Sequence, residues 1–406
     1  MTETHKPHAL ALIEFVPLMA LIVALDALSI DSLLPALPAM ARDLGITNAN
    51  DMQLVVTLMF LGFGFGQIVG GPLSDALGRK PAVYLGLGIY VAGSLLGAVA
   101  PSFSVMVVAR LLQGIGSAIP VIVVNALVRD LYEGEPMARI MSFVGTVFIL
   151  VPVMGPLAGQ GILFFASWRL LFLLYVALAV PAALWFALRQ PETLPPERRL
   201  PLSLTAMFAA TRDVLGRADV LGYILCGGLM TGAFLGYLSS AQQIFQDGYG
   251  VGVRFVLYFS SLALSIGIAL LLNGHLVQRL GMRPMTAAAL AGMALLAFAF
   301  LPVVINFDGL PPLWLTMCYL LASFLLVGIL FGNLTALALE PIGHIAGVGS
   351  GLVGFLQMII GAPLGAYIGR QFAGGITPLV LGMAVLCTLS LAAMAWGERR
   401  RLKQWL

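Results

Sequence analysis

Twelve segments of this chain are apolar over roughly 20 residues each, long enough for a helix to cross the hydrocarbon core of a bilayer. They cover residues 11–40, 52–74, 81–100, 104–127, 138–162, 167–189, 219–243, 254–273, 285–305, 312–337, 346–370 and 376–397. Of the 406 residues, 60% are hydrophobic and 10% are charged, whereas soluble domains carry about 25% charged residues. We therefore expect an all-α membrane protein with 12 transmembrane helices.

One long polar stretch separates the sixth apolar segment from the seventh, and its prolines and charges indicate a linker. We expect an N-terminal six-helix bundle over 1–189, a cytoplasmic linker over 190–218 and a C-terminal six-helix bundle over 219–406. Two loops, GPLSDALGRKP (71–81) and GHLVQRLGMRP (274–284), share glycine, leucine and proline positions at an offset of 203 residues. This repetition predicts two six-helix pseudo-repeats, an architecture that alternates access by rocking one half against the other.

The positions of lysine and arginine predict the orientation of the chain. With both termini in the cytoplasm, sixteen basic residues lie on the cytoplasmic side, four lie outside and Arg110 lies within a span. This bias favours cytoplasmic N- and C-termini. The three cysteines, Cys226, Cys318 and Cys387, lie in apolar segments at no metal or redox spacing, so we expect neither a metal site nor a cofactor.

Two aspartates, Asp26 and Asp31, lie inside the first apolar segment. A carboxylate at the centre of a spanning helix costs about 2.5–3.5 kcal/mol on insertion scales, so such a group usually faces a cavity, has a partner or carries a proton. Five residues correspond to about 140° around a helix, so the two acids need not face the same cavity. The alternative for Asp26 is a carboxylic acid hydrogen-bonded to a neighbouring helix.

The fourth apolar segment contains Arg110 and, one helical turn later, Gln113. Arg110 and Asp31 are predicted to lie at similar depths in the membrane, because each lies a few turns below the outer end of its span. The two are natural electrostatic partners, or they share a network through Gln113. A purely structural ion pair is the alternative to a functional site.

Three motifs resemble those of the major facilitator superfamily. The segment GPLSDALGRKP resembles its signature loop, which implies a gating role for Gly71, Asp75, Gly78 and Arg79; Ala76 departs from the pattern, where a basic residue is common. The segment RLLQG (110–114) matches the pattern R-x-x-Q-G on the same helix. PVMGPLAG (152–159) resembles the antiporter motif of drug exporters, which adds Gly155 and Pro156 to the expected gating residues.

A motif in the first apolar segment resembles one particular group within this superfamily. Its sequence DSLLPALP (31–38) resembles the bicyclomycin/chloramphenicol-resistance group of bacterial drug/proton antiporters. That resemblance implies that Asp31 couples proton and drug. Asp26 departs from related multidrug exporters, whose second acid lies further toward the N-terminus. We also expect Asp26 and Arg110 to take part in proton coupling. For substrate binding we expect Asp31, Arg110, Gln113, Tyr237, Phe148 and Asn333, although Tyr237, Phe148 and Asn333 have packing as their alternative role.

Together these features predict a major facilitator fold and a proton-coupled antiporter that exports small amphiphilic drugs across a bacterial inner membrane. The alternative is an exporter of a sugar, amino acid or other metabolite, which should require a more polar cavity. An enzyme or sensor is disfavoured because no nucleophile constellation, nucleotide loop or large soluble domain is present in the sequence. We expect protons as the coupling ion, a drug and the lipid bilayer as partners, no nucleic acid, and a monomer.

Overall fold

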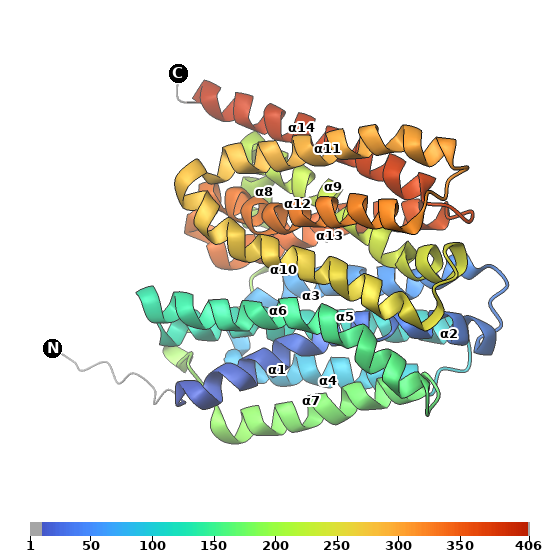
Figure 1. Cartoon of the computed structure of the whole chain (residues 1–406). Coiled ribbons are helices and arrows are strands. Elements are labelled where there is room, and N and C mark those ends of the chain that lie inside the picture. Colours follow the sequence, from blue (N-terminus) through green and yellow to red (C-terminus); the bar gives the residue numbers. More distant parts are fainter. Residues whose placement is uncertain (1–9, 405–406) are drawn as a thin grey trace. The chain divides into compact units, whose positions relative to one another are not determined.

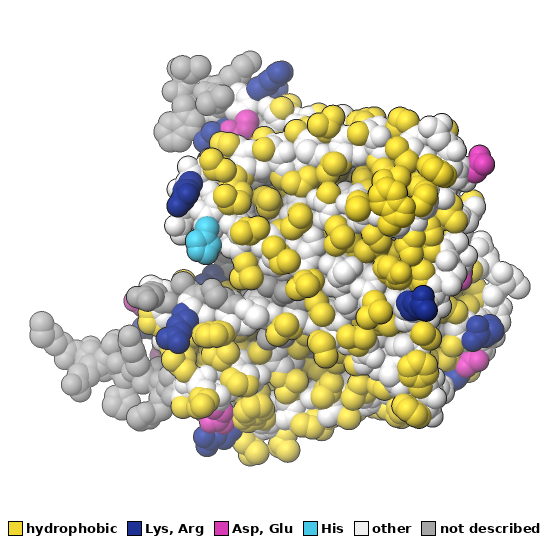
Figure 2. Space-filling view, in the orientation of Figure 1, with side chains coloured by type: hydrophobic (Ala, Val, Ile, Leu, Met, Phe, Trp, Pro, Cys, Tyr) yellow, Lys and Arg dark blue, Asp and Glu magenta, His cyan; other side chains and the backbone are white. Residues whose placement is uncertain are grey.

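A computed structural model describes residues 10–404, and every regular element in that range is a helix (Figure 1). Twelve of its helical segments are long and apolar enough to cross a membrane, which confirms the predicted all-α membrane fold. On the face shown in Figure 2, hydrophobic side chains cover most of the surface, and most charged side chains lie towards the ends of the helices. This distribution suits helices whose outer surfaces contact lipid.

The chain divides into two compact units, the first formed by the residues up to Leu33 together with Leu58–Leu204. In this unit α1 packs against α5, α6 and α7, and α4 packs against α5 and α7. Its helices are α1 (Leu12–Asp31), most of α3 (Gln53–Leu77), α4 (Arg79–Ala98), α5 (Phe103–Leu131), α6 (Gly134–Leu163), α7 (Arg169–Arg189) and the short η3 (Pro196–Arg198).

The second unit is formed by Leu34–Thr57 together with Thr205–Leu406. In it α9 packs against α12, α13 and α14, and α10 packs against α12. Its elements are η1 (Leu34–Ala36), α2 (Leu37–Asp43), η2 (Ala49–Met52), the start of α3, α8 (Leu204–Gly216), α9 (Ala218–Gln242), η4 (Gln243–Gly248), η5 (Gly252–Arg254), α10 (Phe255–Leu280), α11 (Met282–Asn306), α12 (Leu313–Leu339), η6 (Glu340–Ile345), α13 (Ala346–Arg370) and α14 (Thr377–Gln404).

The first membrane span is interrupted, although its sequence predicts one apolar run over 11–40. Helix α1 ends at Asp31, and the chain continues through η1 into α2. Pro35 and Pro38 lack the N–H group that a continuous helix needs at those positions. The Ser32 hydroxyl donates to the carbonyl oxygen of Leu28 at 2.6 Å. The interruption therefore leaves Asp31 as the last residue of a helix inside the membrane.

The two repeated segments are tighter than the loops that the sequence predicts. Helix α3 continues to Leu77 and α4 starts at Arg79, so a single residue, Gly78, makes the turn with φ 102° and ψ 165°. In the second unit α10 ends at Leu280 and α11 starts at Met282, and Gly281 turns with φ 80° and ψ 151°. Only glycine adopts such angles easily. The repeated glycines thus mark the same one-residue helix–helix turn in both halves of the chain.

Candidate functional site

The four polar residues that the sequence predicts inside the membrane in the first unit have buried side chains. Asp26 and Asp31 of α1 are 6% and 5% exposed, and Arg110 and Gln113 of α5 are fully buried. Residues spaced by three, four and seven positions share one face of a helix, and Ser117 completes that series on α5. Ser117 was not among the predicted site residues, although its position seven residues after Arg110 places it on the same helix face.

Asp26 is held by α5. The Ser117 hydroxyl donates to its Oδ1 at 2.6 Å and also lies 3.1 Å from the carbonyl oxygen of Gly114. The charge of Asp26 also interacts with that of Arg110. Asp26 is thus the acid whose charge interacts with Arg110, whereas the sequence suggested Asp31 as the partner.

Arg110 begins a chain of hydrogen bonds that joins three helices. Its Nη1 donates to the carbonyl oxygen of Ser29 on α1 at 3.1 Å and to Oε1 of Gln113 at 2.8 Å. The Gln113 amide then donates to the Ser94 hydroxyl of α4 at 2.8 Å, and that hydroxyl bonds the carbonyl oxygen of Tyr90 at 2.8 Å. Gln113 therefore links Arg110 to α4, as expected of a network, but the hydrogen bonds do not extend to Asp31, with which the sequence predicted that the network would be shared.

Asp31 has different surroundings. Its carboxylate has no hydrogen bond to any of the residues that the structure describes, and it interacts electrostatically with Asp26 and Tyr175. Helix α6 passes close to it, because a Cβ atom on Gly155 would lie 3.0 Å from the Asp31 Cβ. The neighbouring Pro156 is buried in the same helix. The two acids of α1 therefore differ: Asp26 accepts a hydrogen bond from a hydroxyl of α5, and Asp31 accepts none from the described residues.

The candidate substrate residues of the second unit are packed against neighbours. The ring of Tyr237 stacks on Phe259 and meets Phe324 edge-on, with a centroid distance of 4.6 Å to Phe324. Asn333 exchanges two side-chain hydrogen bonds, of 2.9 and 3.1 Å, with Asn273 of α10, a partner that the sequence analysis missed. Phe148 lies on α6, and its side chain lies outside those that the structure describes.

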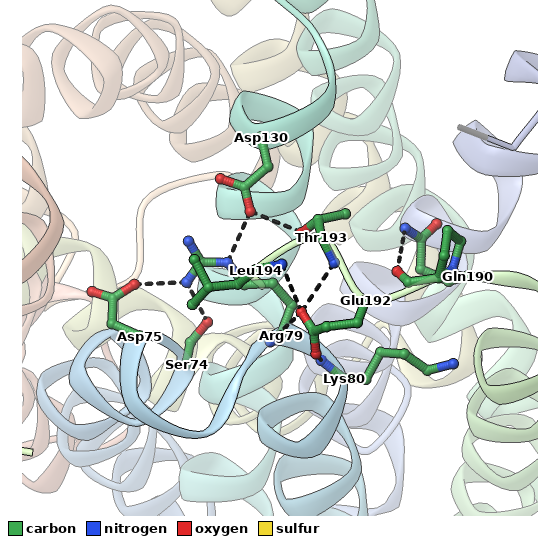
Figure 3. A network of polar contacts seen from close by, with 10 residues as sticks. Ser74, Asp75, Arg79, Lys80, Asp130, Gln190, Glu192, Thr193 and Leu194 are labelled. Atoms are coloured by element: carbon green, nitrogen blue, oxygen red, sulfur yellow. Dashed lines mark hydrogen bonds and ion pairs between the residues drawn. The ribbon is translucent and has the colours of Figure 1, made fainter. Parts of the chain in front are cut away.

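A second polar network surrounds the turn at Gly78 (Figure 3). The Arg79 guanidinium lies between Asp75 of α3 and Asp130 of α5, with N–O distances of 2.6 and 2.9 Å. It also donates to the Ser74 hydroxyl at 2.8 Å. The predicted gating residues Asp75, Gly78 and Arg79 therefore come together, while Gly71 lies within the last turns of α3.

The segment after α7 closes this network from the other side. Glu192 accepts hydrogen bonds from the backbone N–H groups of Arg79 and Lys80, both at 3.0 Å, and so caps the start of α4 (Figure 3). The Thr193 hydroxyl donates to Asp130 at 2.9 Å. A Cβ atom on Gly78 would lie 2.7 Å from the Glu192 carboxylate. Four segments of the first unit thus meet at one turn.

We expect Asp130→Asn to destabilise the first unit by about 1–3 kcal/mol, because Arg79 is largely buried and loses one of its two anionic partners. The measurement is the thermal unfolding temperature of the purified protein. The matched control is Asp308→Asn, since Asp308 is exposed and makes no side-chain hydrogen bond or ion pair with the described residues. Equal unfolding temperatures for the two variants would show that this ion pair contributes nothing.

A third polar network lies in the second unit, where the start of α3 meets α13 and η4. The Gln53 amide donates to Oε1 of Gln243 and to the carbonyl oxygen of Gly369, both at 2.7 Å. The Gln243 amide donates to Asn50 at 2.7 Å, and the Asn50 amide donates to the carbonyl oxygen of Arg370 at 2.9 Å. Gln243 opens a π-helix, a rare element that is frequent at functional sites.

Comparison with known proteins gives one consistent result. Residues 19–366 match the Major Facilitator Superfamily. A bicyclomycin resistance protein homolog of Haemophilus influenzae is 27% identical over 397 residues, which cover 96% of this chain and 97% of that protein. The chloramphenicol resistance protein of Pseudomonas aeruginosa is 29% identical over 384 residues, covering 92% and 87%. A solved D-xylose-proton symporter shares the fold, with a TM-score of 0.74 and 15% identity over 94% of this chain and 96% of that one.

Proposed function

This chain belongs to the major facilitator superfamily of membrane transporters, and from that premise we propose that it is a proton-coupled antiporter that exports small amphiphilic drugs. Its relatives are named for resistance to bicyclomycin and to chloramphenicol, which supports drug export as the activity. We further propose that it works as a monomer in a bacterial inner membrane with both termini in the cytoplasm. The excess of lysine and arginine in the predicted inner segments supports this orientation.

The observation that carries the proposal is the difference between the two buried acids of α1. Asp26 accepts a hydrogen bond from Ser117, and its charge interacts with that of Arg110. In the proposal Asp26 therefore stays in place as the negative charge that balances Arg110. Asp31 has neither of these supports and lies at the interruption of the first span. Interrupted helices at the membrane midplane are where transporters place substrate and coupling-ion sites. We therefore assign the transported proton to Asp31.

The proposed cycle has two half-reactions. Facing outward, Asp31 takes up a proton and the drug leaves. In the occluded intermediate, where water is excluded, a neutral carboxylic acid costs less free energy to bury than a charged carboxylate. Facing inward, the proton leaves and the drug binds at Asp31 beside Arg110 and Gln113. Antiport follows because proton and drug oppose each other's binding at one site, and such coupling is reciprocal.

Three further residues are proposed drug contacts. Tyr237 and Asn333 of the second unit would contribute an aromatic ring and an amide, and Phe148 of the first unit would add a ring from α6. In the described structure the amide of Asn333 is bound to Asn273, so drug binding there requires that pair to separate. The proposal therefore rests on the first unit, and these three residues remain predictions.

The test is drug susceptibility of an efflux-deficient bacterium that expresses the full chain. The panel contains chloramphenicol, florfenicol, bicyclomycin and lipophilic cations, and each drug is repeated with Asp31→Asn. We expect resistance to at least one amphiphilic drug and its loss in the variant. If the well-expressed protein confers no resistance to any compound, the drug-export proposal fails and export of a metabolite becomes the better explanation.

A further inference from the structure

A groove of about 510 Å³ lies between the first turns of α1 and the first turns of α6. Both helices begin on the same side of the first unit (Figure 1). Leu12 and Val16 of α1 and Ile140 and Phe143 of α6 give it apolar walls. Its volume falls within the range of small-molecule sites. None of the three polar networks described above includes these residues, so the groove is a separate feature.

One cation stands at this groove. The guanidinium of Arg139 lines it and lies over the ring of Phe143, 5.8 Å from the ring centroid. Arg139 forms no ion pair with any residue whose side chain the structure describes. Two apolar neighbours are widely open to the surroundings, since Ile13 is 88% and Phe143 is 50% exposed. A guanidinium with no ionic partner among the described side chains, beside an open apolar groove, suits a molecule with an anionic head and a hydrocarbon chain.

We propose that this groove binds one anionic phospholipid from the surrounding bilayer. The phosphate would sit on the guanidinium of Arg139, whose planar fork matches phosphate oxygens. An acyl chain would lie along Leu12, Val16 and Phe143, where apolar contact replaces exposure of these side chains. Basic pockets between membrane helices recognise lipid head groups in this way, and the proposed orientation places the groove in the anionic cytoplasmic leaflet.

Binding should also stabilise the pairing of α1 with α6. The lipid contacts both helices at once, so it binds the packed pair and not the separated helices, and it raises the free energy of unfolding by mass action. The same two helices carry Asp31 and Gly155. The lipid site therefore lies at the start of α1, and the proposed proton carrier lies at the end of the same helix, although lipid binding itself requires no transport.

Native mass spectrometry of the delipidated full-length protein tests the proposal. The probes are dioleoyl phosphatidylglycerol and the zwitterionic dioleoyl phosphatidylcholine, and the variants are Arg139→Gln and Arg279→Gln. Arg279 is an exposed arginine at the end of α10 that lacks an ion pair with the described residues, so it is a matched control. We expect one tightly held phosphatidylglycerol, a roughly fivefold weaker affinity in Arg139→Gln and no change in Arg279→Gln.

A second variant tests the apolar part of the site. Val16→Trp should fill the groove and displace phosphatidylglycerol while Arg139 remains in place. Equal affinities for the two lipids, or equal losses in both arginine variants, would overturn the proposal. It would also be overturned if soluble glycerol phosphate displaced the lipid at similar concentration, since the site would then recognise phosphate alone. Because the readout is binding, a failure of proton-coupled drug export would leave this test unaffected.

Discussion

Asp31→Asn should abolish proton-driven drug export while leaving the folded protein as stable as the original chain. Asparagine keeps the shape of aspartate but cannot carry the proton. Because the Asp31 carboxylate makes no hydrogen bond with the described residues, the substitution removes no structural contact. We therefore expect loss of uphill drug transport in proteoliposomes under a pH gradient, with an unchanged unfolding temperature.

Asp26→Asn provides the contrast on the same helix. It removes a charge that interacts with that of Arg110 and weakens the hydrogen bond that Ser117 donates to the buried carboxylate, and hydrogen bonds to charged groups contribute about 1.5–3 kcal/mol. We therefore expect a clearly lower unfolding temperature for this variant.

Drug-for-drug exchange without a pH gradient should persist in Asp31→Asn, because that exchange needs no proton. Normal proton-driven export by Asp31→Asn would show that the proton is carried elsewhere.

Gly159→Ala should disrupt the site through packing alone. A Cβ atom at this position would collide with the carbonyl oxygen of Ser32 and lie 2.8 Å from its carbonyl carbon, at the point where the first span is interrupted. Backbone atoms cannot move aside as a flexible side chain can, so α6 must shift away from α1. Overpacking of this kind costs about 1–3 kcal/mol, and here it also displaces Asp31. We expect a lower unfolding temperature and loss of drug export.

Gly161→Ala is the matched control on the same helix. Nothing lies within 4 Å of a Cβ atom at Gly161, so the substitution adds no contact. Alanine favours a helix over glycine by about 1 kcal/mol, so this variant should be as stable as the original protein or slightly more so. Similar unfolding temperatures and export rates for Gly159→Ala and Gly161→Ala would show that α6 does not pack against Ser32 as described.

The number and type of membrane helices could be predicted because a lipid environment leaves little choice. Backbone groups in hydrocarbon must be satisfied internally, so each long apolar run becomes a helix. The interruption after Asp31 was not predicted, because the residues on both sides of Pro35 are apolar and form one continuous apolar segment. Helix α8 was not predicted either, because that helix lies in the polar linker between the bundles.

The candidate site was predictable as a set of residues but not as a set of partners. Charges inside apolar segments identified Asp26, Asp31 and Arg110 from composition alone. Which of the two acids interacts with Arg110 depends on how α1 and α5 are rotated about their axes. The pattern of residues along one sequence does not reveal that rotation. The packing of Tyr237 depends on tertiary contact in the same way, because the rings that enclose it come from α10 and α12.

Helix α3 has an unusual position, because residues Gln53–Thr57 belong to the second unit and the rest of the helix to the first. One end is fastened by the amide of Gln53, and the other by the ion pair of Asp75 with Arg79. At 1.5 Å per residue the helix is roughly 37 Å long, and Pro72 removes one of its hydrogen bonds close to the Asp75 end. A helix held at both ends cannot tilt as a whole unless one of the two contacts yields. Any tilt of α3 is therefore resisted by the amide of Gln53 at one end and by the ion pair of Asp75 at the other.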